Sequence, residues 1–180
     1  MAAVGSTISN NRLTSINCTN SGSTGINFTG VAGQNFSIFN NTINSLTSTF
    51  STGINLNSNF TLANIYNNQI YDINGTTAAG IAYGIRINTG TTCNIYNNFI
   101  RDLKAALASV DNSVIGINCT STTASSSINV YYNTIYLNAT STGTNFGSSG
   151  ILHTGSATST TATLDLRNNI IKNTSTANGT

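Results

Sequence analysis

Few residues in this sequence can carry acid–base or nucleophilic chemistry. There is no Glu, and the acidic residues are Asp72, Asp102, Asp111 and Asp165. Asp72 and Asp102 stand at equivalent places in two similar segments, and Arg101 and Lys104 flank the second. Two carboxylates about 5 Å apart can share a proton, bind a divalent cation or cleave a glycosidic bond. Asp72, Asp102 and Arg101 are therefore the candidate catalytic residues.

The rest of the sequence favours a simpler interpretation of this pair. Turns favour Asp for conformational reasons alone, so both carboxylates can equally be solvated or paired with Arg101. His153 is the only histidine, and it lacks a nearby partner in sequence that would make it a base or a metal ligand. The three cysteines show no Cys-x-x-Cys spacing. We therefore expect no enzyme, no metal and no cofactor, and no disulfide.

The elements that would position these residues are internal repeats. Six segments align without a gap: TISNNRLTSI, SIFNNTINSL, NIYNNQIYDI, NIYNNFIRDL, NVYYNTIYLN and LDLRNNIIKN. Their shared Asn recurs at intervals of 30, 27, 30, 35 and 36 residues, at Asn11, Asn41, Asn68, Asn98, Asn133 and Asn169. Each interval also contains a Gly-Ile pair at a similar place, beginning at Gly25, Gly53, Gly84, Gly116 and Gly150. Such a period, with short β-type runs and turn residues in every unit, is typical of the coils of a solenoid.

Aliphatic residues occupy fixed positions around the shared Asn. The residues three places before it are Ile8, Ile38, Ile65, Ile95, Val130 and Leu166. The residues two places after it are Leu13, Ile43, Ile70, Ile100, Ile135 and Ile171. These positions predict strands with an inward aliphatic face. We expect the Asn side chains to form a hydrogen-bonded ladder between coils and to tolerate left-handed bends, and the Gly of each Gly-Ile pair to adopt a positive φ.

This pattern resembles the right-handed parallel β-helix of the pectin-lyase-like superfamily. Residues 129–180 also resemble repeats of very large secreted bacterial surface proteins. The repeats predict about six coils of 27–36 residues in a single all-β solenoid domain over residues 1–180, in agreement with the fold that the resemblance implies. The resemblance also implies an extracellular or cell-surface location. Enzymes of that superfamily bind Ca²⁺ through acidic clusters, or hydrolyse polysaccharides through several Asp residues beside an Arg or Lys. The resemblance therefore implies that a catalytic site in this chain would consist of Asp72, Asp102 and Arg101.

One outward position is repeatedly aromatic. The residues two places before the shared Asn include, in four consecutive repeats, Phe39, Tyr66, Tyr96 and Tyr131. A stripe of rings is suited to bind sugar rings or a partner surface. The alternative is that the rings only stabilise the sheet through contacts between neighbouring strands.

Composition excludes several function classes. Charged residues make up 6% of the chain and the net charge is +2, too little for a nucleic-acid-binding face. The sequence contains no apolar run long enough to predict a membrane-spanning segment. Residues 1–9 lack the features of a signal peptide. Runs of Thr bring ice binding into consideration, but no outward position is consistently Thr.

The sequence therefore predicts a non-catalytic extracellular structural or adhesive module. We expect no obvious cap at either end, since no amphipathic helix precedes Ile8 and a Ser/Thr tail follows Ile171. The expected partners are adjoining solenoid repeats or further copies that stack end to end as a filament, and glycans. The alternative function is a carbohydrate-active enzyme, either a polysaccharide lyase or a glycoside hydrolase, or a glycan-binding β-helix. Ice binding is the more remote one.

Overall fold

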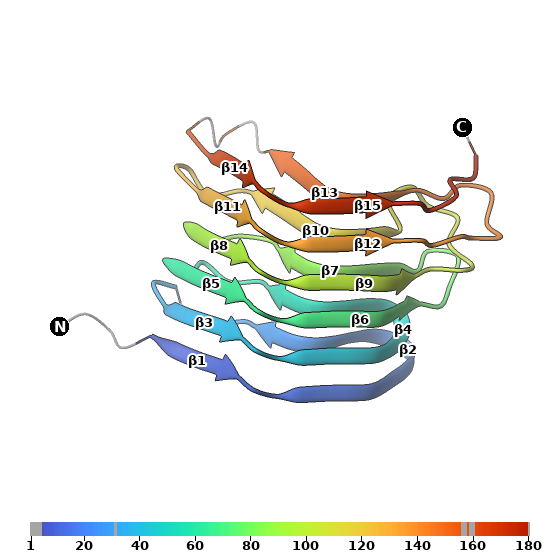
Figure 1. The fold of residues 1–180 in the computed structure, drawn as a ribbon, viewed down its shortest axis with the longest axis horizontal. Coiled ribbons are helices and arrows are strands. Elements are labelled where there is room, and N and C mark those ends of the chain that lie inside the picture. Colours follow the sequence, from blue (N-terminus) through green and yellow to red (C-terminus); the bar gives the residue numbers. More distant parts are fainter. Residues whose placement is uncertain (1–4, 31, 156–157, 159–160, 180) are drawn as a thin grey trace.

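The computed structural model describes residues 5–30, 32–155, 158 and 161–179. These residues form strands and no helix, and neighbouring strands of both sheets run parallel. The chain winds through about five turns, and every coil lies on the one before it (Figure 1). The prediction of an all-β parallel solenoid is confirmed. In the described part of the chain, no helix is long and apolar enough to cross a membrane.

Each repeat contributes strands to two sheets. The first sheet has the order β1 (Ser6–Ser9), β3 (Asn35–Phe39), β5 (Leu62–Tyr66), β8 (Thr92–Tyr96), β11 (Ser127–Tyr131) and β14 (Thr163–Arg167). The second sheet contains β2 (Arg12–Phe28), β4 (Thr42–Leu56), β6 (Gln69–Gly75), β7 (Ile81–Ile87), β9 (Phe99–Lys104), β10 (Val114–Ser121), β12 (Thr134–Leu137), β13 (Ser148–Gly155) and β15 (Ile170–Asn173). The long strand β4 pairs with β6 through its first half and with β7 through its second half.

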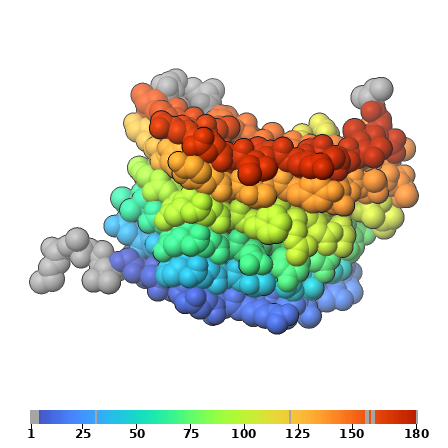
Figure 2. Space-filling model, viewed as in Figure 1, coloured from blue at the N-terminus to red at the C-terminus, as the bar shows by residue number. Residues whose placement is uncertain are grey.

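The core consists of the aliphatic positions that the sequence predicts. Ile38, Ile65, Ile95 and Val130 pair in register along the first sheet and are fully buried. The second aliphatic position behaves likewise from Ile43 to Ile135. At the last coil the same positions are open, because Leu166 is 48% exposed and Ile171 is 45% exposed. In the space-filling view the coils follow one another as bands from blue to red (Figure 2).

The shared Asn residues form the predicted ladder inside the corner between the two sheets. The Nδ2 atoms of Asn41 and Asn68 each donate to the Oδ1 of the next Asn at 3.0 Å. At most 1% of the surface of each of four ladder residues is exposed: Asn41, Asn68, Asn98 and Asn133. From Asn41 onward, each ladder amide also donates to a strand carbonyl of the preceding coil, as Asn68 does to Ile38 at 2.9 Å. The ladder therefore satisfies buried backbone groups where the chain leaves one sheet for the next.

Two details of the corners differ from the sequence-based expectations. The left-handed residue is not the ladder Asn but the one before it, as in Asn40 (φ 55°), Asn67 (φ 54°) and Tyr132 (φ 54°). The glycines of the Gly-Ile pairs do not have a positive φ. Glycine is needed there for space, because a Cβ on Gly84 would lie 2.5 Å from the Gly116 carbonyl oxygen and 2.7 Å from Ile100 Cγ2.

The Ala/Leu-rich stretch at residues 101–112 contains no helical turn. It continues β9 as far as Lys104 and then makes turns. Ala105 and Ala108 are fully buried, whereas Leu107 is exposed. Residues 105–112 thus form a loop that packs two small side chains against the solenoid core.

Candidate functional site

The candidate carboxylates lie on adjacent strands, with a lysine between them. The pairing of β6 with β9 places Asp72 beside Asp102, and both occupy left-handed corners with φ of 54° and 53°. Lys104 Nζ lies 3.0 Å from Asp72 Oδ1 and 3.2 Å from Asp102 Oδ1. The sequence pattern correctly brings the two carboxylates together. It misses Lys104 as their partner, although this residue stands only two places after Asp102.

The lysine changes what this pair can do chemically. Burial alone would raise the pKa of Asp72, but hydrogen bonds donated by Lys104 and Ser45 hold it below its ordinary value. For Lys104, burial alone would lower the pKa, and its hydrogen bonds to both carboxylates raise it instead. Asp72 therefore stays ionised at neutral pH and is a poor general acid. The ammonium group also occupies the space that a shared proton or a cation would need.

Arg101 does not join this ion triad of Asp72, Lys104 and Asp102. Its guanidinium carbon lies 4.3 Å from the ring centre of Tyr71 and 5.7 Å from that of Phe99. Tyr136 follows in register on the next strand, and Lys172 Nζ lies 5.7 Å from the Tyr136 ring. Aromatic and cationic residues thus alternate along one outward column, at a position three places after the shared Asn. That spacing is the signal by which this column can be found in the sequence.

The aromatic stripe is a stack of rings over three coils. Tyr66 lies between Phe39 and Tyr96, with ring centres 4.8 Å apart and planes 2° from parallel on both sides. The fourth ring, Tyr131, donates its hydroxyl to Asp165 Oδ2 at 2.8 Å and has the Arg167 guanidinium over it. Both faces of the Tyr66 ring are covered by its neighbours, and Phe39 and Tyr96 each have one face covered by Tyr66. The stacked rings therefore present mainly their edges to solvent. This geometry accounts for the stripe as a stabilising contact between strands.

A second amide ladder runs beside the aromatic stripe and is absent from the sequence-based expectations. Asn94 Nδ2 donates to Asn64 Oδ1 at 2.9 Å, and Asn129 Nδ2 donates to Asn94 Oδ1 at 2.8 Å. These three residues stand four places before the shared Asn in consecutive repeats. Their recurrence is a usable signal, but the abundance of Asn in every repeat conceals it.

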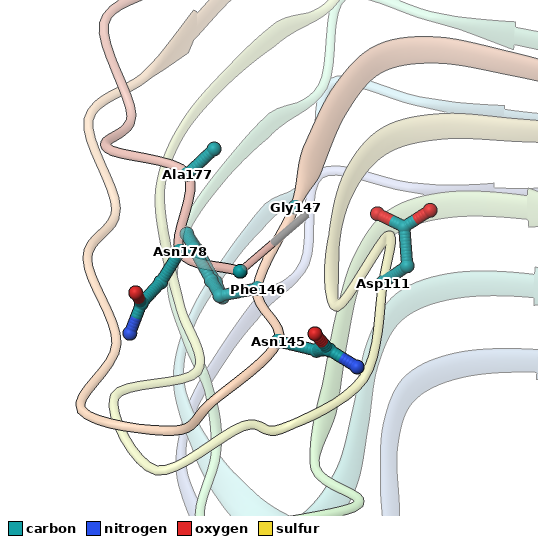
Figure 3. Close-up of a pocket in the computed structure, with 7 residues that line it drawn as sticks. Asp111, Asn145, Phe146, Gly147, Ala177 and Asn178 are labelled. Carbon is teal, nitrogen blue, oxygen red and sulfur yellow. The ribbon is translucent and has the colours of Figure 1, made fainter.

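Two surface cavities lie where loops leave the coils. One of about 290 Å³ is lined by Asp111, Phe146 and Asn178 among others, and Asp111 and Asn178 stand on opposite sides of it (Figure 3). The other, of about 300 Å³, is lined by Asp102, Lys104 and by the Asn and Thr side chains Asn74, Asn138 and Thr140. Within the described ranges, His, Cys, Asp and Glu form no group of three that could hold a metal ion.

The cysteines and the histidine lie apart from these cavities. Cys93 and Cys119 are buried free thiols, and Cys18 is a partly buried free thiol. Burial raises the pKa of Cys119 to about 12, so this thiol is unreactive at neutral pH. His153 pairs in register with Cys119, a core position, but its own side chain is exposed at the last coil.

Comparison with known proteins does not assign the chain to a family. No family model, no curated protein and no solved structure matches the chain. The link to the pectin-lyase-like superfamily and to bacterial surface proteins thus rests on the repeat pattern alone. What the structure shows is a parallel β-solenoid of about five turns with an internal asparagine ladder.

Proposed function

We propose that the chain is a non-catalytic, extracellular structural module that lengthens a β-solenoid by stacking coil on coil. The observation that carries the proposal is the change along the two aliphatic columns. Their members are fully buried in the inner coils, yet Leu166 and Ile171 are about half exposed at the last coil. Large apolar side chains of a core column become buried only when another coil packs on them.

The chemistry of the surface supports a structural rather than a catalytic role. Charged residues amount to 6% of the chain. Of the acidic residues, Asp72 and Asp102 are bound to Lys104, and Asp165 is bound to Arg167 Nη2 at 2.6 Å. The resemblance to secreted surface proteins supports the extracellular location. Stacked amides and rings on the outside strengthen a rod without requiring a ligand.

The test is to extend the solenoid by one coil. A second copy of residues 46–74, fused directly after Asn173 so that residue 46 takes the next place in the repeat, would lay copies of β5 and β6 on β14 and β15. It should raise the thermal midpoint and protect the amides of β14 and β15 from hydrogen exchange. The matched control carries Asn at the fused copies of Ile65 and Ile70, and it should give neither effect. An intact added coil that changes neither property would contradict the proposal, as would release of oligosaccharides from polysaccharide by the unmodified chain.

Glycan binding is the second candidate, and the cavity beside Lys104 favours it. Its lining combines a carboxylate, an ammonium group, two amides and a hydroxyl group, from Asp102, Lys104, Asn74, Asn138 and Thr140. Such groups match the hydroxyls of a sugar. Binding to a glycan array that Asn138→Ala abolishes and Tyr96→Ala preserves would support this candidate at the cavity. Binding that requires Tyr96 instead would place it at the aromatic stripe.

A further inference from the structure

We infer that copies of this chain stack head to tail, so that Asn169 of one copy continues its ladder into Asn11 of the next. This inference rests on the proposed function and names its partner. It follows from the direction of the ladder, from the residues that would meet at the junction, and from the symmetry that the junction must have.

The ladder has a direction. In each step the backbone N–H and the Nδ2 of one Asn donate to the Oδ1 of the next Asn along the chain, as Asn133 does to Asn169 at 3.0 Å. Among the described residues, nothing donates to the Oδ1 of Asn11, and the backbone N–H of Asn169 donates to nothing. One end face of the solenoid thus presents a free acceptor, and the other presents a free donor.

The columns of the two end faces also match when they are continued across a junction. Leu166 would lie over Ile8, and Ile171 would lie over Leu13, which places apolar side chains on apolar side chains. The charged residues of the last coil would meet hydroxyls, with Asp165 over Thr7, Arg167 over Ser9 and Lys172 over Thr14. No two like charges face each other in these columns. The strand edges of β1 and β14 each pair on one side only, so the junction also completes backbone hydrogen bonds.

A two-fold junction lacks this match. Two C-terminal faces placed together would set the donor of Asn169 against a second donor. Two N-terminal faces would set the acceptor of Asn11 against a second acceptor. Each arrangement leaves the ladder groups unsatisfied. The head-to-tail contact is heterologous, and because it repeats along the solenoid axis it forms an open filament rather than a closed dimer.

Two variants with one blocked end each test this inference. Ile8→Asp blocks the N-terminal face, Ile171→Asp blocks the C-terminal face, and Gln69→Asp is a matched control at an exposed position of the inner strand β6. The unmodified chain and the control should form species whose mass, measured by light scattering, grows with concentration. Each blocked variant should be monomeric alone. An equimolar mixture of the two should form dimers and nothing larger, since one intact face of each kind remains.

Other outcomes have distinct meanings. If a blocked variant dimerises alone, the junction is two-fold and the inference is wrong. If the unmodified chain stays monomeric at every concentration, self-stacking is wrong, while the added-coil experiment still decides whether the proposed function holds. The far-ultraviolet circular dichroism of each variant must match that of the unmodified chain. If Ile8→Asp disturbs the fold, Asn11→Ala replaces it, because that substitution removes only the acceptor and its polar contacts.

Discussion

Replacing Asn98 with alanine is the sharpest test of the ladder. The Nδ2 of Asn98 donates to Ile65 O at 2.9 Å, to Tyr96 O at 3.1 Å and to Asn133 Oδ1 at 2.9 Å. Its Oδ1 accepts from both the backbone N–H and the Nδ2 of Asn68 at 3.0 Å. All of these groups lie at a buried corner, where no water replaces a lost partner.

The magnitude follows from the groups that the substitution leaves without partners. The Asn68 N–H and the Ile65 carbonyl lose the contacts that the side chain supplied. Each buried polar group left unsatisfied costs about 1–3 kcal/mol, so the loss of partners for these two groups should lower the free energy of unfolding of Asn98→Ala by about 2–6 kcal/mol. Urea denaturation followed by circular dichroism measures this change. Asn11→Ala is the matched control, because the side chain of Asn11 is exposed and makes two hydrogen bonds.

The control should lose less than about 1 kcal/mol, since water can replace those two bonds. An equal, small loss for Asn98→Ala and Asn11→Ala would refute the reasoning, because the ladder would then add nothing beyond surface hydrogen bonds. An equal, large loss of unfolding free energy in both variants would mean that the ladder contacts of the first coil contribute as much as those of the central coils. That result would contradict the exposure of the Asn11 side chain.

Three further predictions concern packing, pH and thiol reactivity. Gly84→Ala should lower the free energy of unfolding by about 1–3 kcal/mol through overpacking, whereas Gly155→Ala, with its nearest atom 3.9 Å away, should be neutral by denaturation. Because the pKa of Asp72 is lowered in the folded state, its contribution should be present above about pH 4 and be lost as pH falls through the folded value. The ion triad is largely exposed, so the contribution should stay below about 1 kcal/mol and vanish in Lys104→Met in a pH series of urea melts. In the folded chain only the thiol of Cys18 should react with Ellman's reagent at neutral pH, and all three thiols should react after unfolding. Reaction of more than one thiol under native conditions would show that the core opens.

The core and the ladder are predictable because both depend on residues that recur at a fixed offset. Ile65, Ile95 and their equivalents must face inward if the strands are in register, and a buried Asn at each corner must find a partner in the next coil. Register follows from these repeats even though the intervening loops differ in length.

Other features depend on distances that a repeat pattern does not contain. Lys104 reaches both Asp72 and Asp102 because a long side chain turns back along the strands, and its column position alone does not indicate this. The role of Gly84 depends on a carbonyl and a methyl group in two other strands. The cavities lie between loops of unequal length, where neither offset nor composition predicts which side chains converge.

The stacking of coils along one axis has a mechanical consequence. The strands lie across the axis, so a force that pulls the two ends of the solenoid apart passes through all coil interfaces in series. Each interface bears the full force, and the interfaces fail one at a time. A coil of 27–36 residues that detaches releases about 100 Å of extended chain, whereas the rod shortens by only about 4.8 Å. The module is thus stiff at low load and highly extensible beyond a threshold, and it can dissipate work coil by coil while the remaining coils stay folded.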